Sequence, residues 1–61
     1  MPVVHVHLWE GRTEAQLKEI IEGITDVFVK MGSKPDSVKV ILHDIPKTHW
    51  GAGGKPASEN S

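Results

Sequence analysis

The sequence predicts a small α/β (α+β) domain: a β-α-β subunit with two parallel strands, one crossover helix and a C-terminal hairpin or loop. Residues 3–9 and 37–44 alternate with the period of two that is typical of strands, and residues 14–31 between them carry an apolar stripe of helical period. A helix of this length between two strands indicates a crossover connection, which joins parallel strands and is right-handed in about 98% of cases.

The first strand is expected over residues 3–9, where β-branched residues are enriched. Alternation places two different sets of side chains on its two faces. One set is Val4, Val6 and Leu8, and the other is Val3, His5, His7 and Trp9. Both sets contain bulky groups, so we expect both faces of this strand to contact protein.

The helix is expected from Glu14 to Met31. Thr13 is a favourable N-cap and Gln16 follows it by three residues, as in a capping box. Gly32 is placed to end the helix. The apolar residues keep the i, i+3, i+4, i+7 spacing of a helix packed on a sheet, and they are Leu17, Ile20, Ile21, Ile24, Val27, Phe28 and Met31.

The remaining segments are a turn at residues 34–36, a second strand over 37–44, and a glycine-rich hairpin or tight loop at 51–54. In the second strand, Val38, Val40 and Leu42 alternate with Lys39, Ile41 and His43. Residues 56–61 are mostly polar and are expected to form a frayed tail. The whole chain, 1–61, is therefore expected to be a single domain.

The size of the chain predicts self-association. A chain of 61 residues buries only about 60% of the surface that its unfolded form exposes, and such small proteins are commonly stabilised by disulfides, metals or oligomerisation. The sequence has no cysteine, which excludes disulfides. One helix covers one face of a parallel sheet, although both faces are normally covered. The uncovered face would hold Val3, His5, Trp9 and Ile41, so we expect a homo-oligomer with sheet-to-sheet contact.

Several functional classes are disfavoured by composition. The net charge is −1, and the seven basic residues are dispersed along the chain instead of forming the basic footprint of a nucleic-acid-binding protein. The longest apolar run is too short to span a bilayer, and the N-terminus lacks the features of a signal peptide. We therefore expect a cytoplasmic protein with no nucleic-acid or membrane partner.

Pro2 is the first candidate for chemistry. If Met1 is removed, Pro2 presents a secondary amine that can accept or donate a proton without using a side chain. With Met1 attached, the same nitrogen is an unreactive amide. The alternative is that Pro2 simply begins the strand, a position where proline is tolerated because no hydrogen-bond donor is needed.

Two cations are candidates for binding a carboxylate. Arg12 precedes the helix, where the helix dipole disfavours a cation, and its guanidinium matches a carboxylate with two parallel hydrogen bonds. Lys39 lies on the face of the second strand that the helix does not cover, so burial in an oligomer would require an anion beside it. The alternative for each residue is a solvated side chain.

Aromatic and imidazole side chains complete the set of candidates. Trp9 and Trp50 lie outside the helical stripe and suit either an interface or an apolar wall beside Pro2. His5, His7 and His43 permit a metal-site hypothesis, but a zinc site needs at least three converging ligands. Packed or partly exposed imidazoles are the preferred interpretation, and we expect no metal and no cofactor.

These residues, in this order and spacing, resemble the 4-oxalocrotonate tautomerase family over nearly the whole chain. The features that carry the resemblance are Pro2, His7 with the Glu10-Gly11-Arg12 triplet, the Ser37-Val38-Lys39-Val40 strand and the segment Lys47-Thr48-His49-Trp50-Gly51. The resemblance implies a β-α-β subunit, commonly in a hexamer built as a trimer of dimers, with active sites shared between neighbours. It also implies that the amino-terminal proline is the general base.

Carried over by position, the resemblance implies that Pro2 moves the proton, Arg12 binds a distal carboxylate, and Trp9 and Trp50 wall the pocket. Lys39 falls where the best-known members have arginine. This departure matters because lysine offers a compact charge instead of a bidentate fork. Both tryptophans are also larger than the residues usual in the family, which reshapes the pocket.

The expected function is therefore that of a cofactor-independent tautomerase, an isomerase that catalyses enol-keto 1,3- or 1,5-proton transfer. Its substrate would be a small 2-hydroxy-dienoate or a related 2-oxo acid. One alternative is a hydratase or dehalogenase of the same superfamily, in which Glu10 or Asp44 would activate water. The other is a non-catalytic or metal-binding homo-oligomeric module that uses His5, His7 and His43.

Overall fold

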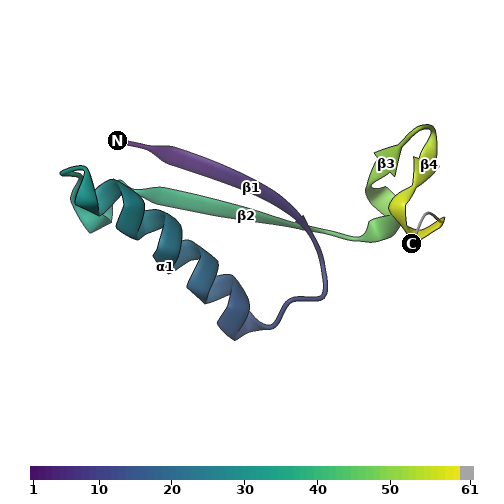
Figure 1. Ribbon diagram of the computed structural model, residues 1–61, viewed down its shortest axis with the longest axis horizontal. Coiled ribbons are helices and arrows are strands. Elements are labelled where there is room, and N and C mark those ends of the chain that lie inside the picture. Colours follow the sequence, from purple (N-terminus) through teal and green to yellow (C-terminus); the bar gives the residue numbers. More distant parts are fainter. Residues whose placement is uncertain (60–61) are drawn as a thin grey trace.

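The computed structural model describes residues 1–59 and has the predicted β-α-β order followed by a small hairpin (Figure 1). The elements in chain order are β1 (Val3–Trp9), α1 (Glu14–Lys30), β2 (Lys39–Ile45), β3 (Gly51–Ala52) and β4 (Lys55–Pro56). Single turns of 3₁₀ helix occupy Pro35–Ser37, Lys47–His49 and Ala57–Glu59. The predicted fold class, with parallel strands and a crossover helix, is confirmed.

Parallel pairing of β1 with β2 forms the main sheet, and its register runs from Val3 beside Lys39 to Trp9 beside Ile45. The second strand begins two residues later than predicted, because Pro35 starts a 3₁₀ turn in which the Ser37 N–H donates to the Lys34 carbonyl. It extends one residue further, to Ile45, and ends before a proline, which has no N–H for a ladder hydrogen bond.

The helix begins and ends with the predicted capping residues. The Gln16 N–H donates to Thr13 Oγ1 over 3.2 Å, and the Thr13 N–H donates to Gln16 Oε1 over 3.0 Å, which completes the capping box. Gly32 has φ +106°, a left-handed conformation that favours glycine, and its N–H donates to the Val29 carbonyl. Met31 caps the helix instead of belonging to it, so α1 ends one residue earlier than predicted.

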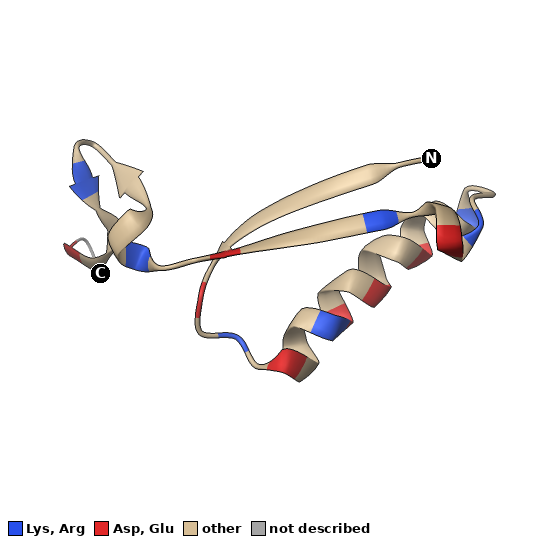
Figure 2. Cartoon of the chain, turned by 180° about the vertical axis from the view of Figure 1, so that it is seen from behind, with Lys and Arg blue, Asp and Glu red and all other residues tan. Residues whose placement is uncertain are grey.

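The helix covers one face of the sheet and leaves the other face open. Leu8 on the covered face is buried, whereas Val3, Trp9 and Ile41 on the opposite face are 54%, 40% and 42% exposed. Four of the eight acidic residues lie in α1, and β1 carries no Lys, Arg, Asp or Glu (Figure 2). A single chain therefore leaves an apolar sheet surface facing solvent, as the sequence predicts.

The single chain is elongated. Its extents are 43 × 23 × 13 Å and its radius of gyration is 14.4 Å, compared with roughly 10–11 Å for a compact domain of this length. Its accessible surface is 4662 Å², whereas a compact protein of 6.7 kDa exposes about 3900 Å². The excess is similar in size to one partner's share, about 800 Å², of a standard protein interface.

The hairpin of β3 and β4 lies beyond the end of the main sheet (Figure 1). The prediction of a frayed tail from residue 56 is wrong for residues 56–59. Pro56 belongs to β4, and Ala57 is buried and donates its N–H to the Trp50 carbonyl over 2.7 Å. These contacts stabilise the segment through packing that composition does not reveal. Residues 60 and 61 of the predicted tail lie outside the described residues.

Within residues 1–59, none of the helices combines the length and the apolar character needed to cross a membrane.

Replacing Thr13 by alanine should lower the free energy of unfolding by about 1 kcal/mol, because the capping box loses its side-chain acceptor. Urea denaturation at one fixed protein concentration measures the change, since self-association makes stability depend on concentration. Thr48→Ala is the matched control, because Thr48 is exposed in the 3₁₀ turn Lys47–His49. Equal effects of the two substitutions would contradict the role of the cap.

Candidate active site

Pro2 lies immediately before β1, half-buried, at the end of the sheet where β2 begins. Its carbonyl accepts a hydrogen bond from the Lys39 N–H over 3.0 Å, which continues the parallel ladder to this residue. Met1 precedes it and is 89% exposed. With Met1 attached, the Pro2 nitrogen is an amide, so the described form of the chain presents the position of the predicted base without its free amine.

Lys39 occupies the same end of the sheet. It pairs with Val3 and lies on the face that α1 leaves open, as the alternation of the strand predicts. The side chain is exposed, and Nζ donates to the Asp36 carbonyl over 3.0 Å. In the single chain, the ammonium group is therefore bound to the turn that precedes its own strand.

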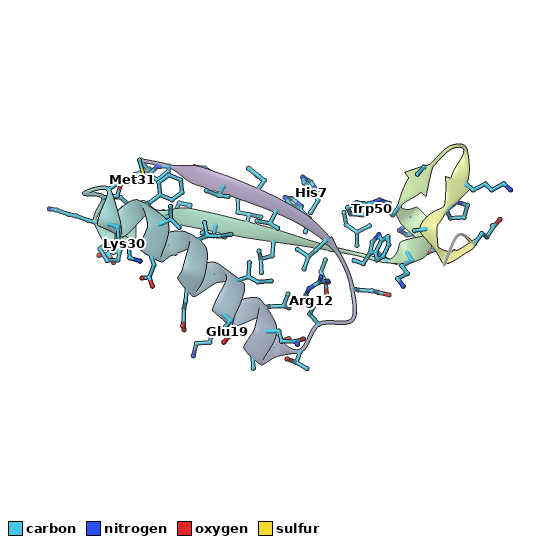
Figure 3. The ribbon with its side chains drawn as sticks, in the orientation of Figure 1. His7, Arg12, Glu19, Lys30, Met31 and Trp50 are labelled. Carbon is cyan, nitrogen blue, oxygen red and sulfur yellow. The ribbon has the colours of Figure 1, made fainter. Side chains whose placement is uncertain are left out.

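Arg12 lies at the opposite end, in the exposed connection between β1 and α1 (Figure 3). Nη1 donates to the carbonyl of Trp9 over 3.0 Å, which fixes the guanidinium against the last residue of β1. Gly11 between them has φ +122°, a conformation that L side chains rarely adopt. The Glu10-Gly11-Arg12 sequence thus forms a turn that places the Arg12 side chain against the end of β1.

Trp9 and Trp50 are also brought together at this end. Their ring centroids are 5.9 Å apart at an interplanar angle of 79°, an edge-to-face contact that attaches the hairpin segment to β1. Lys47 Nζ lies 4.7 Å from the centroid of the Trp9 ring, within cation–π distance. Sequence reasoning missed Lys47, although the pairing of Trp9 with Ile45 brings the residues that follow β2 close to this ring.

The three histidines of the sheet are neighbours on the open face. His5 Nδ1 and His43 Nε2 are 3.0 Å apart and share a hydrogen bond. His7 stacks on His43, with ring centroids 4.3 Å apart and an interplanar angle of 10°. Over residues 1–59, no three His, Cys, Asp or Glu side chains are grouped so that they could hold a metal ion.

The candidate residues form two groups at opposite ends of one subunit. Pro2 and Lys39 lie at the start of the strands, whereas Trp9, Trp50 and Arg12 lie at their ends. At about 3.3 Å per residue, a strand from residue 2 to residue 9 spans roughly 23 Å. One chain alone therefore does not bring the candidate base and the candidate carboxylate-binding arginine to the same small molecule.

Comparison with known proteins gives consistent matches along the chain. The family model described as "Tautomerase enzyme" matches residues 2–60. A 2-hydroxymuconate tautomerase from Comamonas testosteroni is 40% identical over 60 residues, covering 97% of this chain and 95% of the relative.

Solved structures of similar proteins share the fold. TomN, a 4-oxalocrotonate tautomerase homologue of the tomaymycin biosynthetic pathway, has a TM-score of 0.89 at 28% identity, covering 97% of this chain and 92% of that one. A 4-oxalocrotonate tautomerase isozyme from Methylibium petroleiphilum has a TM-score of 0.83 at 40% identity, covering 93% and 94%. Because the sequence and structural matches both span nearly the whole domain, the chain belongs to the tautomerase family and is an isomerase of the 4-oxalocrotonate tautomerase type.

Proposed function

We propose that this protein is a cofactor-independent tautomerase of 2-hydroxy-dienoates or related enol carboxylates, with Pro2 as the general base. The observation that carries the proposal is the position of Pro2, which follows Met1 directly and is held beside the first residue of β2 by its carbonyl. Removal of the exposed Met1 gives a secondary amine at the edge of the sheet. The 2-hydroxymuconate tautomerase similar to this chain supports this substrate class.

The proposed reaction needs only one group that accepts and then returns a proton. The Pro2 amine removes the proton of the substrate 2-hydroxyl, and the oxygen electron pair forms the C2 carbonyl. The electrons of the enol double bond move to C3 in a 1,3-transfer, or through the diene to C5 in a 1,5-transfer. That carbon then takes the proton from the prolyl ammonium, which regenerates the amine. Atoms and electrons balance without a metal, a redox cofactor or water.

The proposed site is shared between neighbouring copies in a homo-oligomer, and the specific assembly that we propose is a hexamer. Pro2 and Lys39 would come from one subunit and Arg12 from a neighbour, because the strand between the two ends of one chain, from residue 2 to residue 9, spans roughly 23 Å. The excess exposed surface and the open apolar face of the single chain support self-association. Assembly would therefore complete both the core and the active site.

Each binding residue has a separate role in this proposal. Arg12 binds the distal carboxylate of the substrate, and Trp9 and Trp50 form an apolar wall from their edge-to-face pair. Lys39 binds the carboxylate or the 2-oxygen next to the reacting centre, exchanging its present bond to the Asp36 carbonyl for the substrate anion. A single ammonium grips a carboxylate less specifically than a bidentate guanidinium does.

Met1 should be absent from the active protein, and Pro2→Ala with Met1 still removed should lower kcat/KM by roughly 10²–10⁴-fold, the usual contribution of a general base. Intact mass establishes the terminus, and ultraviolet absorbance follows ketonisation of 2-hydroxymuconate and phenylenolpyruvate. A preparation that retains Met1 is the matched control and should be inactive. Full activity with Met1 attached would refute the proline base, and no acceleration of either substrate would favour a non-catalytic module.

Arg12→Ala should chiefly raise KM for substrates with a second carboxylate, because only the contact to the distal carboxylate is lost. The KM of monocarboxylates should be unchanged. Lys39→Ala should depress kcat for both classes, and Lys39→Arg should improve the use of dicarboxylates through a bidentate contact. Steady-state kinetics on the two substrates separate these effects. Lys18→Ala on the exposed surface of α1 is the control. Unchanged kinetics in both Lys39 variants would assign this residue to the solvated surface.

The protein should be a homo-oligomer at micromolar concentration, and Ile41→Asp should dissociate it, because a carboxylate would enter the open apolar face. Burial of each large side chain contributes about 1.5–3 kcal/mol. Sedimentation velocity measures the mass, and Ile41→Val is the matched control that keeps the face apolar. A stable, folded monomer of the unsubstituted chain at dilute concentration would overturn the shared-site proposal.

A further inference from the structure

The open face of the sheet carries a row of imidazoles across its centre. His7 and His43 occupy paired positions of β1 and β2, and His5 precedes His7 on the same face. His43 is half-buried and lies between the other two rings, hydrogen-bonded to His5 and stacked on His7. Apolar residues flank this row on both strands, so the histidines lie within the surface that self-association would bury.

The contact between His5 and His43 requires that at least one ring be neutral. A neutral imidazole has one donor nitrogen and one acceptor nitrogen, whereas an imidazolium has two donors and no acceptor. The Nδ1 and Nε2 atoms are 3.0 Å apart, which is a hydrogen-bond distance. If both rings were protonated, the bond would be lost and two like charges would face each other at that distance.

Within β1 and β2, no carboxylate lies on this face to balance such charges. Among the described residues, the other titratable groups of the face are Lys39, at the start of β2, and Lys47, which lies over Trp9 at the far end. Asp44 alternates with His43 and therefore lies on the opposite face. The helix α1 packs on that opposite face, and its charged residues are Glu14, Lys18, Glu19, Glu22, Asp26 and Lys30.

We propose that the row of His5, His7 and His43 makes self-association of this protein sensitive to pH. Copies of the chain join through the open face when the imidazoles are neutral, and they separate when the imidazoles are protonated. The occupant of the face is a second copy of the chain. The single chain exposes more surface than a compact protein of its mass, and this excess is close to the area that one partner buries in a standard interface. The inference rests on the assembly in the proposed function.

The direction of the pH dependence follows from proton binding. The separated chains expose the imidazoles to water and can bind more protons than the assembly, which holds uncompensated rings against an apolar surface. The state that binds more protons is favoured as pH falls, so dissociation increases with acidity. Histidine is the side chain that ordinarily changes charge between pH 5 and 8, so the transition belongs in that interval.

Sedimentation velocity of the full chain between pH 8 and pH 5.5, at one fixed protein concentration, tests the proposal. This range stays above the ordinary titration of carboxylates. For each linked proton, the dissociation constant should rise by up to about tenfold for every unit that the pH falls below about 6. The double variant His5→Gln/His43→Gln should lose most of this dependence, because glutamine keeps hydrogen-bonding capacity without acquiring charge. His49→Gln, which removes a histidine outside the row, should behave as the unsubstituted chain.

The outcomes separate this inference from the proposed function. An assembly whose mass does not change between pH 8 and pH 5.5 would overturn the pH sensitivity and leave the tautomerase proposal intact. A monomer at pH 8 would overturn the assembly and the inference together. If the double variant does not fold, imidazole NMR titration of the unsubstituted chain decides. The His5 and His43 midpoints should shift with protein concentration while that of His49 stays fixed, and concentration-independent midpoints for all three would overturn the proposal.

Discussion

The parallel register of β1 with β2 is the constraint on which the rest of this structure depends. Pairing of Val3 with Lys39 holds Pro2 at the edge of the sheet, and pairing of His7 with His43 gathers the imidazoles on the open face. The same register ends β2 beside Trp9, so that the segment after β2 can reach the Trp9 ring. A shift of one residue would reverse the faces of β2 and separate these groups.

The second determinant is the imbalance between one helix and two sheet faces. α1 satisfies its own ends through the capping box and the glycine at residue 32, and it buries one side of the sheet. Among residues 1–59, no other helix or strand covers the second side, and the hairpin extends away from the sheet instead of folding back over it (Figure 1). Folding of the subunit therefore buries one face of the sheet, and the proposed assembly buries the other.

Periodicity was sufficient to predict the strands, the helix and the open face, because each depends on local alternation. The boundaries of β2 differ by one or two residues, since Pro35 begins a 3₁₀ turn that alternation alone does not reveal. The ordered segment at Pro56 and Ala57 was missed because its stability comes from contact with Trp50, far from the local pattern. The sequence named the candidate residues other than Lys47, and their roles stay predictions. Their division between the two ends of the subunit follows from strand length.

The exposed Met1 in front of Pro2 has a practical consequence for the proposed mechanism. A reactive backbone nitrogen, unlike a reactive side chain, is consumed by any peptide joined to it. With an affinity tag or fusion partner at the amino terminus, the proline nitrogen would be an amide, and the protein would fold but be inactive. The amino terminus and the hairpin of β3 and β4, near the last described residues, lie at opposite ends of the subunit (Figure 1). Carboxy-terminal tagging is therefore the design that leaves the proposed chemistry available.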